Sequence, residues 1–549
     1  MLGSQTASVL SIRRLLPWLC RNGTPYLNDR GFVDFTPHDI DNPRNWPRHW
    51  KWFITTYVAA IAWSGSLTSS IPAGSIDSIR DEFGISKEVA GLTITMYLLG
   101  YCIGPLIVSP LSEFYGQQRI FQITVLSYMI FNLVSAFALN FTTHLVGRLF
   151  AGISIASGLS NAPAVLTDMW DDMERGNAMV LYSLMVWAGP SVGPVISGFL
   201  DISKGWRWGL YVAVWFGGIV TLLLPTLPET NARAILARRA SDIRRMKIKG
   251  FENVVAEGEA STLPIKTIYK TSLTRPWKLF FDPISFFCCF YLSFVFTLQY
   301  MLFCIYPIVF QDIRGWKPGI AQLPLLGTTI GYVLGALFLL LDTIRRRKKL
   351  KTHKYLEPED RLYASMFGGV LFAASMFWFT WTAGNTSIHW MVPTVAGAVL
   401  ASSLMLTFSA YINYVVDSYT SYAAAAMAAN TCARSIGSAV SPLYTTYMFK
   451  SLGVVGGGML IAGLATILAI IPFLLYKYGG SVRGRSKWAS GSCTVPEEKH
   501  FSDSEASTPT TTTPTSATST MTVEELLKSM EQSKRKVEFS VERVERNRA

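Results

Sequence analysis

Twelve long apolar runs constrain the fold of this chain more than any other feature. Each run is about as long as a bilayer-spanning helix, which needs roughly 20 residues. The strands of a membrane β-barrel would instead alternate over about ten residues. We therefore predict an all-α polytopic membrane protein. Its twelve spans are expected at about 52–75, 88–111, 119–138, 142–166, 178–201, 208–226, 284–310, 319–341, 363–383, 389–416, 423–448 and 454–476.

The placement of positive charge predicts the topology. Only 15% of the 549 residues are charged, and the formal net charge is +13. If the amino terminus is cytoplasmic, most loop lysines and arginines fall on the inner side, above all in 227–283 and in RRRKK at 345–349. This bias predicts that both termini are cytoplasmic. The basic excess thus indicates topology and attraction to anionic lipids, and we expect no nucleic-acid partner.

The spacing of the spans predicts five parts. Two groups of six spans flank a long loop, and a site between repeated halves is typical of secondary transporters. The Ser/Thr-rich carboxyl end is too polar to bury a core, so we expect it to be disordered. The parts are a cytoplasmic tail at 1–50, a six-helix bundle at 51–226, a cytoplasmic loop at 227–283, a second six-helix bundle at 284–478 and a disordered cytoplasmic tail at 479–549.

Other chemistry is not indicated by the sequence. The seven cysteines show neither metal-ligand spacing nor a disulfide framework, and we interpret those inside spans as small buried apolar residues. The six histidines are scattered, so we expect no metal, no cofactor and no enzyme activity. Asn140 and Asn385 begin possible glycosylation sequons, but both lie in very short outer loops, which favours non-use.

Several motifs together resemble one transporter family. They are DNPRNWPRHWKW at 41–52, LSEFYGQQR at 111–119, GRLFAG at 147–152, LTDMWDDMERGNAMVLYSL at 166–184, GPSVGPVISGF at 189–199, GWRW at 205–208, LPET at 227–230 and INYVVDSYTSYAAAAMAANTCARSIGSA at 412–439. This set is similar to the major facilitator superfamily, in particular its fungal twelve-span drug:proton antiporter branch. The resemblance covers residues 41–490 and does not fix the substrate.

The resemblance implies a function. We expect the major facilitator fold and secondary active, proton-coupled efflux of a small amphipathic organic compound, such as a secondary metabolite, toxin or drug, by alternating access. The expected protein is a monomer in the plasma membrane, with a vacuolar or vesicular membrane as the alternative. A facilitator or uptake carrier of the same fold stays open, as does a transporter-like membrane sensor.

Polar residues inside the spans predict the substrate site. A buried guanidinium costs at least about 2.5 kcal/mol in lipid, so Arg148 and Arg434 should face a cavity or a partner. The resemblance places Arg148 at the family's coupling arginine. For Arg434, substrate contact and a clasp to backbone carbonyls are both open, and each polar residue has interhelical hydrogen bonding as its alternative. The further candidates are Asn161, Gln299, Tyr300, Asn413 and Asn430, with Trp63, Trp187 and Phe408 as apolar wall.

The spans lack acidic residues at mid-depth. Many relatives carry a glutamate in a pattern like FEAYP, whereas this chain has FCIYP at 303–307, with Cys304 at that place. A cation would find no counter-charge, so we expect a neutral or anionic substrate, and the usual carboxylate for proton coupling is missing. Asp77, Glu113 or the substrate's own acid would then carry a coupled proton.

The motif after the second span predicts a cytoplasmic gate. Glu113 should meet the amino-terminal end of the eleventh span, and Gly116 should make the turn. In the family the residues after this glycine are basic and resemble a latch to the acidic end of the fourth span, here Asp168. Because Gln117 and Gln118 are neutral, we expect Arg119 or Arg175 to take that role.

Small residues at four-residue spacing predict close helix packing. One set lies in the fifth span and one in the eighth, and prolines soften the first. The resemblance makes these spans neighbours across the two bundles, so we interpret both sets as a seam between bundles; packing within one bundle is the alternative. The sets are Gly189, Pro190, Gly193, Pro194 and Gly198, then Gly327, Gly331 and Gly335.

Overall fold

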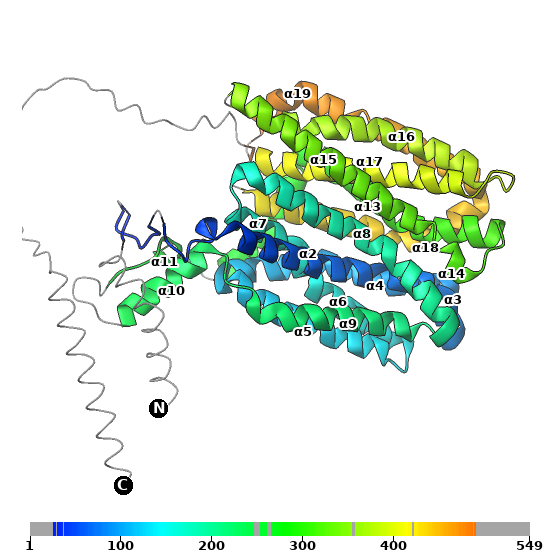
Figure 1. Ribbon diagram of the computed structural model, residues 1–549, viewed down its shortest axis with the longest axis horizontal. Coiled ribbons are helices and arrows are strands. Elements are labelled where there is room, and N and C mark those ends of the chain that lie inside the picture. The colour runs from blue at the N-terminus through cyan, green and yellow to red at the C-terminus, as the bar shows by residue number, and fades with distance from the viewer. Residues whose placement is uncertain are drawn as a thin grey trace, which may run out of the picture. The chain divides into compact units, whose positions relative to one another are not determined.

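Long helices dominate the structure, a computed structural model (Figure 1). It describes residues 26–28, 30–36, 38–245, 253–260, 265–353, 357–419, 422–486 and 488–489. Residues 35–495 belong to one compact unit. In the other unit, Leu27 and Val33 form an isolated antiparallel bridge.

The helices fall into two sets joined by a connector. The first set is α2 (Arg48–Ser70), η2 (Ile71–Gly74), α3 (Ile76–Phe83), α4 (Lys87–Tyr115), α5 (Gln117–Ala136), α6 (Phe141–Ser160), α7 (Ala162–Met169), α8 (Asp172–Lys204) and α9 (Arg207–Leu223). The connector holds η3 (Leu224–Thr226), α10 (Ala232–Arg245), α11 (Glu257–Ala260) and α12 (Ile265–Phe280). The second set is α13 (Pro283–Pro307), η4 (Ile308–Ile313), α14 (Pro318–Ala321), α15 (Leu325–His353), η5 (Pro358–Arg361), α16 (Leu362–Ala383), α17 (Met391–Ser418), α18 (Ala423–Leu468) and α19 (Ile471–Arg485). A short 3-10 turn, η1 (Pro43–Asn45), precedes α2.

Ten helical segments of the described residues are long and apolar enough to cross a membrane. The last of them, Ala425–Gly484, has 60 residues and contains two of the twelve predicted spans. Its helix α18 is interrupted at Gly453, where φ is 70°, a backbone conformation that glycine adopts without strain and residues with a Cβ rarely adopt. The chain is thus an all-helical multi-span membrane protein.

Helix α2, the first predicted span, is not among the ten because serines and threonines lower its hydropathy. These side chains are buried and bond to neighbouring helices. Thr68 Oγ1 lies 2.6 Å from the Tyr128 hydroxyl, and Ser69 Oγ lies 2.8 Å from the Tyr300 hydroxyl. Helix α2 therefore packs against other helices over much of its surface. At such contacts hydroxyl groups form interhelical hydrogen bonds, and high hydropathy is not required.

The two sets meet along two helix pairs. Helix α8 packs against α15, and α4 packs against α18 (Figure 1). Polar contacts cross both seams, since Thr328 Oγ1 donates to Ser191 Oγ at 2.8 Å and Thr95 Oγ1 donates to the Ala439 carbonyl at 2.7 Å. These seams place residues of both sets around one central region.

The small residues of the fifth and eighth spans do not form the seam that we expected. A Cβ at Gly189 or Gly193 would meet α2, and a Cβ at Gly331 would meet the Ala398 carbonyl of α17. Gly327 and Gly335 also face α17. These glycines therefore bring helices of the same set together, which was the alternative interpretation. Gly198 differs, because its Cβ would lie 3.5 Å from Gly319 Cα in the second set.

A buried ion pair fastens the connector to the segment before α2. Arg239 on α10 bonds to Asp39 at 2.6 and 3.1 Å, and both side chains are almost fully buried, at 3% and 1% exposure. Arg239 also bonds to Asp41 at 2.7 Å, whose side chain is 60% exposed. Burial lowers the pKa of Arg239 and the two carboxylates raise it, with a net upward shift. The guanidinium thus stays charged and needs its buried counter-ion.

We expect Asp39→Asn to destabilise this region strongly. Removing one partner of a buried ion pair costs about 3–5 kcal/mol, because the other charge remains buried. Thermal unfolding and protease cleavage of the connector measure the effect. Asp41→Asn is the matched control on the same arginine, and its exposed carboxylate predicts a loss of about 0–1 kcal/mol. Equal losses for both variants would contradict this interpretation.

Candidate substrate site and cytoplasmic gate

Arg148 of α6 is the central charge of the first set. Its side chain is fully buried, and its guanidinium lies 4.2 Å from the Tyr97 ring centroid. Nη2 donates to the carbonyls of Thr68 at 2.9 Å and Ser69 at 3.3 Å, and Nε donates to the carbonyl of Thr93 at 3.2 Å. Within the described residues it has no carboxylate partner, and Nη1 has no hydrogen-bond partner. Carbonyl dipoles therefore solvate this cation, and the two N–H groups of Nη1 remain available.

The local sequence explains why the Thr68 and Ser69 carbonyls are free to accept. In an α-helix, the Thr68 carbonyl would bond to the N–H of residue 72, but that residue is Pro72, which has none. Ser69 lies in the last turn of α2, where carbonyls lack intrahelical partners and carry the negative end of the helix dipole. The break between α2 and η2 thus makes an acceptor site for Arg148.

Arg434 of α18 is the corresponding charge of the second set. Its guanidinium lies 4.7 Å from the Phe296 centroid and 5.2 Å from the Phe408 centroid. In the described structure it forms no hydrogen bond to a carbonyl, and Nε has no partner. Asn430, one turn earlier on α18, is buried with both amide atoms unpartnered among the described residues. The carbonyl clasp that we considered for Arg434 is therefore absent from the described contacts.

Aromatic side chains lie near both arginines. Tyr101 and Tyr300 lie close enough to interact electrostatically with both guanidinium groups. Trp187 on α8 contacts rings of the second set, at 5.0 Å from Phe408 and 5.8 Å from Phe296. The indole N–H of Trp187 has no partner within the described residues. The central region is hence aromatic and positively charged, with unused hydrogen-bonding groups.

The other predicted substrate residues divide into two groups. Gln299 bonds to the Tyr332 hydroxyl and lies 3.5 Å from Ser191 Oγ, so it joins both sets of helices. Asn161 is buried at the end of α6, with its amide nitrogen unpartnered in the described structure. By contrast, Asn413 is half-buried and donates to its own helix at Ser409, 2.7 Å away. Trp63 packs on Phe216 within the first set and is not part of the aromatic cluster with Trp187.

Gly116 makes the turn between α4 and α5. Its φ is +90°, and a Cβ there would collide with the Glu229 carboxylate. Glu229 Oε1 accepts from the backbone N–H of Gln117 at 2.9 Å, and Oε2 accepts from that of Gln118 at 3.3 Å. A carboxylate at a helix amino terminus is stabilised by the dipole and by the free N–H groups. The LPET motif thus caps the helix that follows LSEFYG.

Gln117 occupies the place beside Asp168 that we expected an arginine to take. Its Nε2 donates to Asp168 Oδ2 at 3.1 Å, and its Oε1 accepts from the Thr230 hydroxyl at 2.7 Å. Arg119 is exposed, and Arg175 lies 3.9 Å from Asp417 of the second set. The side chain of Glu113 lies outside the described part of the structure, so its expected role stays a prediction.

The second set carries a charged version of the same contact. Arg361, at the start of α16, bonds to Asp417 at 2.6 Å near the end of α17. This matches the relation of Gln117, at the start of α5, to Asp168 at the end of α7. The first set therefore has an amide where the second set has a guanidinium.

We expect Gln117→Arg to form an ion pair with Asp168 and to strengthen the inner contact. A half-buried pair of this kind is worth about 0–1 kcal/mol, so the ratio of outward-facing to inward-facing protein should rise up to about fivefold. Accessibility of engineered cysteines at the outer and inner ends measures this ratio. Gln118→Arg is the control, because Gln118 Nε2 bonds to the Leu227 carbonyl and not to Asp168. If neither or both variants shift the ratio, the latch hypothesis is wrong.

Two buried groups near these sites were not identified from the sequence. Glu229 was assigned to a motif without a role, since its capping of α5 depends on a contact across 112 residues. His144 lies one turn before Arg148, and its Nδ1 is 3.0 Å from Ser135 Oγ while Nε2 is unpartnered in the described structure.

No group of three His, Cys, Asp or Glu among the described residues has the geometry of a metal site. The sequons lie at exposed Asn140, which caps α6, and at Asn385, which bonds to the Ser387 N–H.

A multi-span helical protein with buried cations and aromatic groups where two helix sets meet has the architecture of a solute transporter. The Major Facilitator Superfamily model matches residues 53–442, and the chain belongs to this family of transporters, which are not enzymes. The solved structure of the proton:xylose symporter XylE with 6-bromo-6-deoxy-D-glucose is similar in fold. Its TM-score is 0.58 at 17% identity, and the match covers 79% of this chain and 96% of that one.

Fungal efflux proteins are similar over most of the chain. The efflux pump FUBT of Fusarium oxysporum is 38% identical over 470 residues, which is 84% of this chain and 78% of that protein. The multidrug transporter mdrA of Aspergillus fumigatus is 38% identical over 463 residues, 84% of this chain and 76% of that protein. The efflux pump MFS2 of Trichophyton rubrum is 38% identical over 468 residues, 85% and 78% of the two chains.

Proposed function

We propose that this protein is a secondary active efflux transporter for a small amphipathic organic compound, neutral or anionic, such as a secondary metabolite, toxin or drug. The observation that carries the proposal is the pair of buried guanidinium groups, Arg148 and Arg434, without a carboxylate partner among the described residues. A buried cation with a free donor favours an anionic or hydrogen-bond-accepting ligand. The surrounding rings of Trp187, Phe296 and Phe408 suit an apolar body.

The proposed architecture has twelve spans in two six-helix bundles, with both termini cytoplasmic. The break at Gly453 and the buried polar face of α2 support two spans more than hydropathy alone identifies. The contacts of α8 with α15 and of α4 with α18 support bundles that rock against each other. We further propose a monomer in the plasma membrane, in keeping with the efflux role of the relatives.

We propose coupling to protons, carried by Asp77, Glu113 or the substrate's own acid. Asp77 pairs with Arg80 at 3.4 Å and Lys87 at 3.2 Å at the outer surface. His144 is a further titratable group, buried one turn from Arg148. The absence of an acid in the middle of the spans favours a facilitator as the second candidate.

Transport by purified protein in phosphatidylcholine vesicles tests the proposal. We expect an imposed pH gradient to drive accumulation of an amphipathic anionic dye more strongly than that of a matched cationic dye. Transport that ignores the gradient would identify a facilitator, and preference for the cationic dye would overturn the substrate class. No transport of any dye, combined with signalling that depends on the carboxyl-terminal tail, would indicate a sensor.

A further inference from the structure

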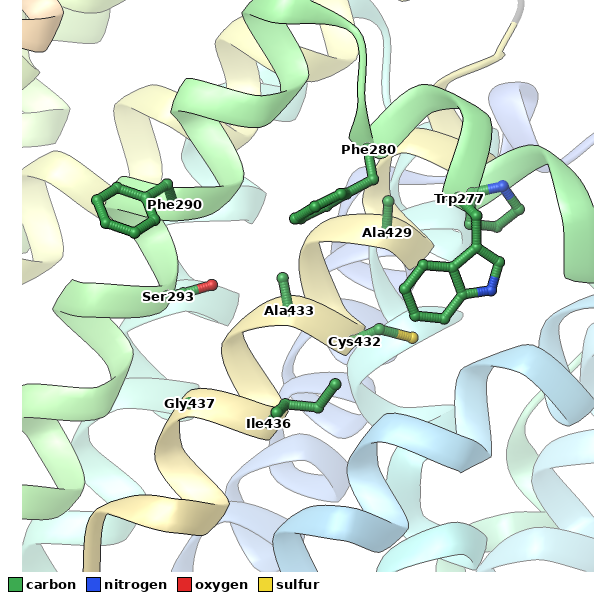
Figure 2. Close-up of a pocket in the computed structure, with 10 residues that line it drawn as sticks. Trp277, Phe280, Phe290, Ser293, Ala429, Cys432, Ala433, Ile436 and Gly437 are labelled. Carbon is green, nitrogen blue, oxygen red and sulfur yellow. The ribbon is translucent and has the colours of Figure 1, made fainter. Parts of the chain in front are cut away.

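A cavity lined by neither Arg148 nor Arg434 opens between three helices. Its volume is about 340 Å³, and it is bounded by the end of α12, the first half of α13 and the first half of α18 (Figure 2). Trp277 and Phe280 come from α12, Phe290 from α13, and Ala433 and Ile436 from α18. Figure 2 shows the small side chain of Ala433 between these larger groups. The wall is therefore largely apolar and has a small residue at its centre.

The cavity faces the surroundings of the helices. Trp277 is 49% exposed, Phe290 is 56% exposed and Ile436 is 43% exposed. In a membrane-spanning protein, large apolar side chains exposed on helices face lipid hydrocarbon. Neither Arg148 nor Arg434 lines this cavity. A hydrocarbon chain can thus enter from the bilayer without passing through the central region.

The end of α12, which contributes Pro276, Trp277 and Phe280 to the lining, has the character of a membrane interface. Arg275 and Lys278 lie on the last turns of α12 and are exposed, and Arg275 lies 5.6 Å from the Tyr422 ring centroid. Phe281, directly after α12, is 74% exposed. A basic helix end with exposed aromatic residues is typical of a segment at the headgroup level. With the proposed topology, this level is the cytoplasmic leaflet, which carries anionic lipids.

We propose that this cavity binds an anionic phospholipid of the cytoplasmic leaflet. One acyl chain occupies the space beside Ala433, and the phosphate group lies against Arg275 and Lys278. The inference rests on the proposed orientation and is independent of the transported compound. The chain moves from lipid hydrocarbon into the cavity, so the apolar wall selects it by shape and packing, and each basic contact strengthens binding about fivefold.

The purified full-length protein in detergent tests this site by native mass spectrometry with added phosphatidylserine. We expect phosphatidylserine to be retained more strongly than phosphatidylcholine, and inorganic phosphate not to compete because it lacks the chain. Arg275→Gln and Lys278→Gln should each weaken retention about fivefold. Both residues are exposed, so these substitutions should leave the fold intact, and a loss of retention then reports on lipid binding.

Filling the cavity tests the chain position. Ala433→Phe should lower retention of phosphatidylserine toward that of phosphatidylcholine, because the added ring fills the space beside the acyl chain. Ala374→Phe is the matched control, since Ala374 is exposed on α16, outside the cavity lining. Equal retention by the two alanine variants, or equal retention of the two lipids, would overturn the proposal. Displacement of the lipid by a transported dye would also overturn it, by assigning the cavity to the substrate. Because retention is measured without transport, failure of the proposed efflux activity leaves this test intact.

Discussion

Replacing Arg148 with methionine is expected to reduce transport to background while the protein stays folded. Methionine keeps an unbranched apolar stem but has no donor for the carbonyls of Thr68, Ser69 and Thr93. Interhelical hydrogen bonds in membranes average about 0.6 kcal/mol each, so the fold should tolerate their loss. The positive charge at the meeting point of α2, α4 and α6 disappears entirely, and with it the attraction for an anionic group.

Arg148→Lys distinguishes the effect of the positive charge from the effect of the hydrogen-bond geometry. A lysine ammonium is a single point of charge, whereas the planar guanidinium reaches carbonyls on two helices at once. We expect Arg148→Lys to retain a small part of the transport rate. Initial rates of dye flux in vesicles, normalised to protein amount, measure both variants.

Arg314 supplies the matched control. It too donates to backbone carbonyls, to Ile388 at 2.8 Å and to Asn385 at 3.0 Å, but outside the central region. Arg314→Met should lower thermal stability slightly and leave flux intact. If Arg148→Met transports normally, or if both methionine variants lose transport equally, Arg148 is only a structural residue.

Replacing Arg434 with glutamine is expected to change selectivity rather than to abolish transport. The arginine lies against Phe296 and Phe408 without a carbonyl or carboxylate partner among the described residues, so its charge is available to a ligand. A hydrogen bond to a charged group contributes about 1.5–3 kcal/mol, which is about ten- to hundredfold in affinity. We expect a loss of that size for an anionic dye and a much smaller loss for a neutral one.

Competition assays with paired anionic and neutral dyes measure this selectivity. Arg434→Lys keeps the charge and should retain part of the anion preference, although a lysine stacks less well on aromatic rings. Phe296→Leu is the companion variant, because it removes one ring while keeping the guanidinium. An unchanged ratio of anionic to neutral transport in Arg434→Gln would refute the role of this charge.

The pattern of the sequence identified the helices better than it identified their neighbours. Apolar runs marked the spans because the bilayer sets their length. The stripe at Gly327, Gly331 and Gly335 marked a close approach, but a stripe does not say which helix approaches. The structure places α17 there rather than α8. Only contacts between distant segments distinguish these possibilities.

The candidate site was likewise predictable in part. Arginines in an apolar run are readily recognised as candidates, because the free-energy cost of a charge in lipid indicates that each one has a partner or faces a cavity. The amide of Asn413 looked equivalent to that of Asn430, yet it bonds within its own helix while the other is unpartnered in the described structure. The role of Glu229 was hidden because its partners, Gln117 and Gln118, are more than a hundred residues away.

Pro72 has a consequence for how a ligand is exchanged. Because it leaves the Thr68 carbonyl without a backbone donor, Arg148 is solvated by fixed dipoles instead of by a mobile counter-ion. The proposed anionic cargo would therefore replace no bound counter-ion on arrival, and on departure it would leave a cation that the backbone already accommodates. Under that proposal, loading and unloading add and remove one charge at this position, and the membrane potential would act on the charge of the cargo itself.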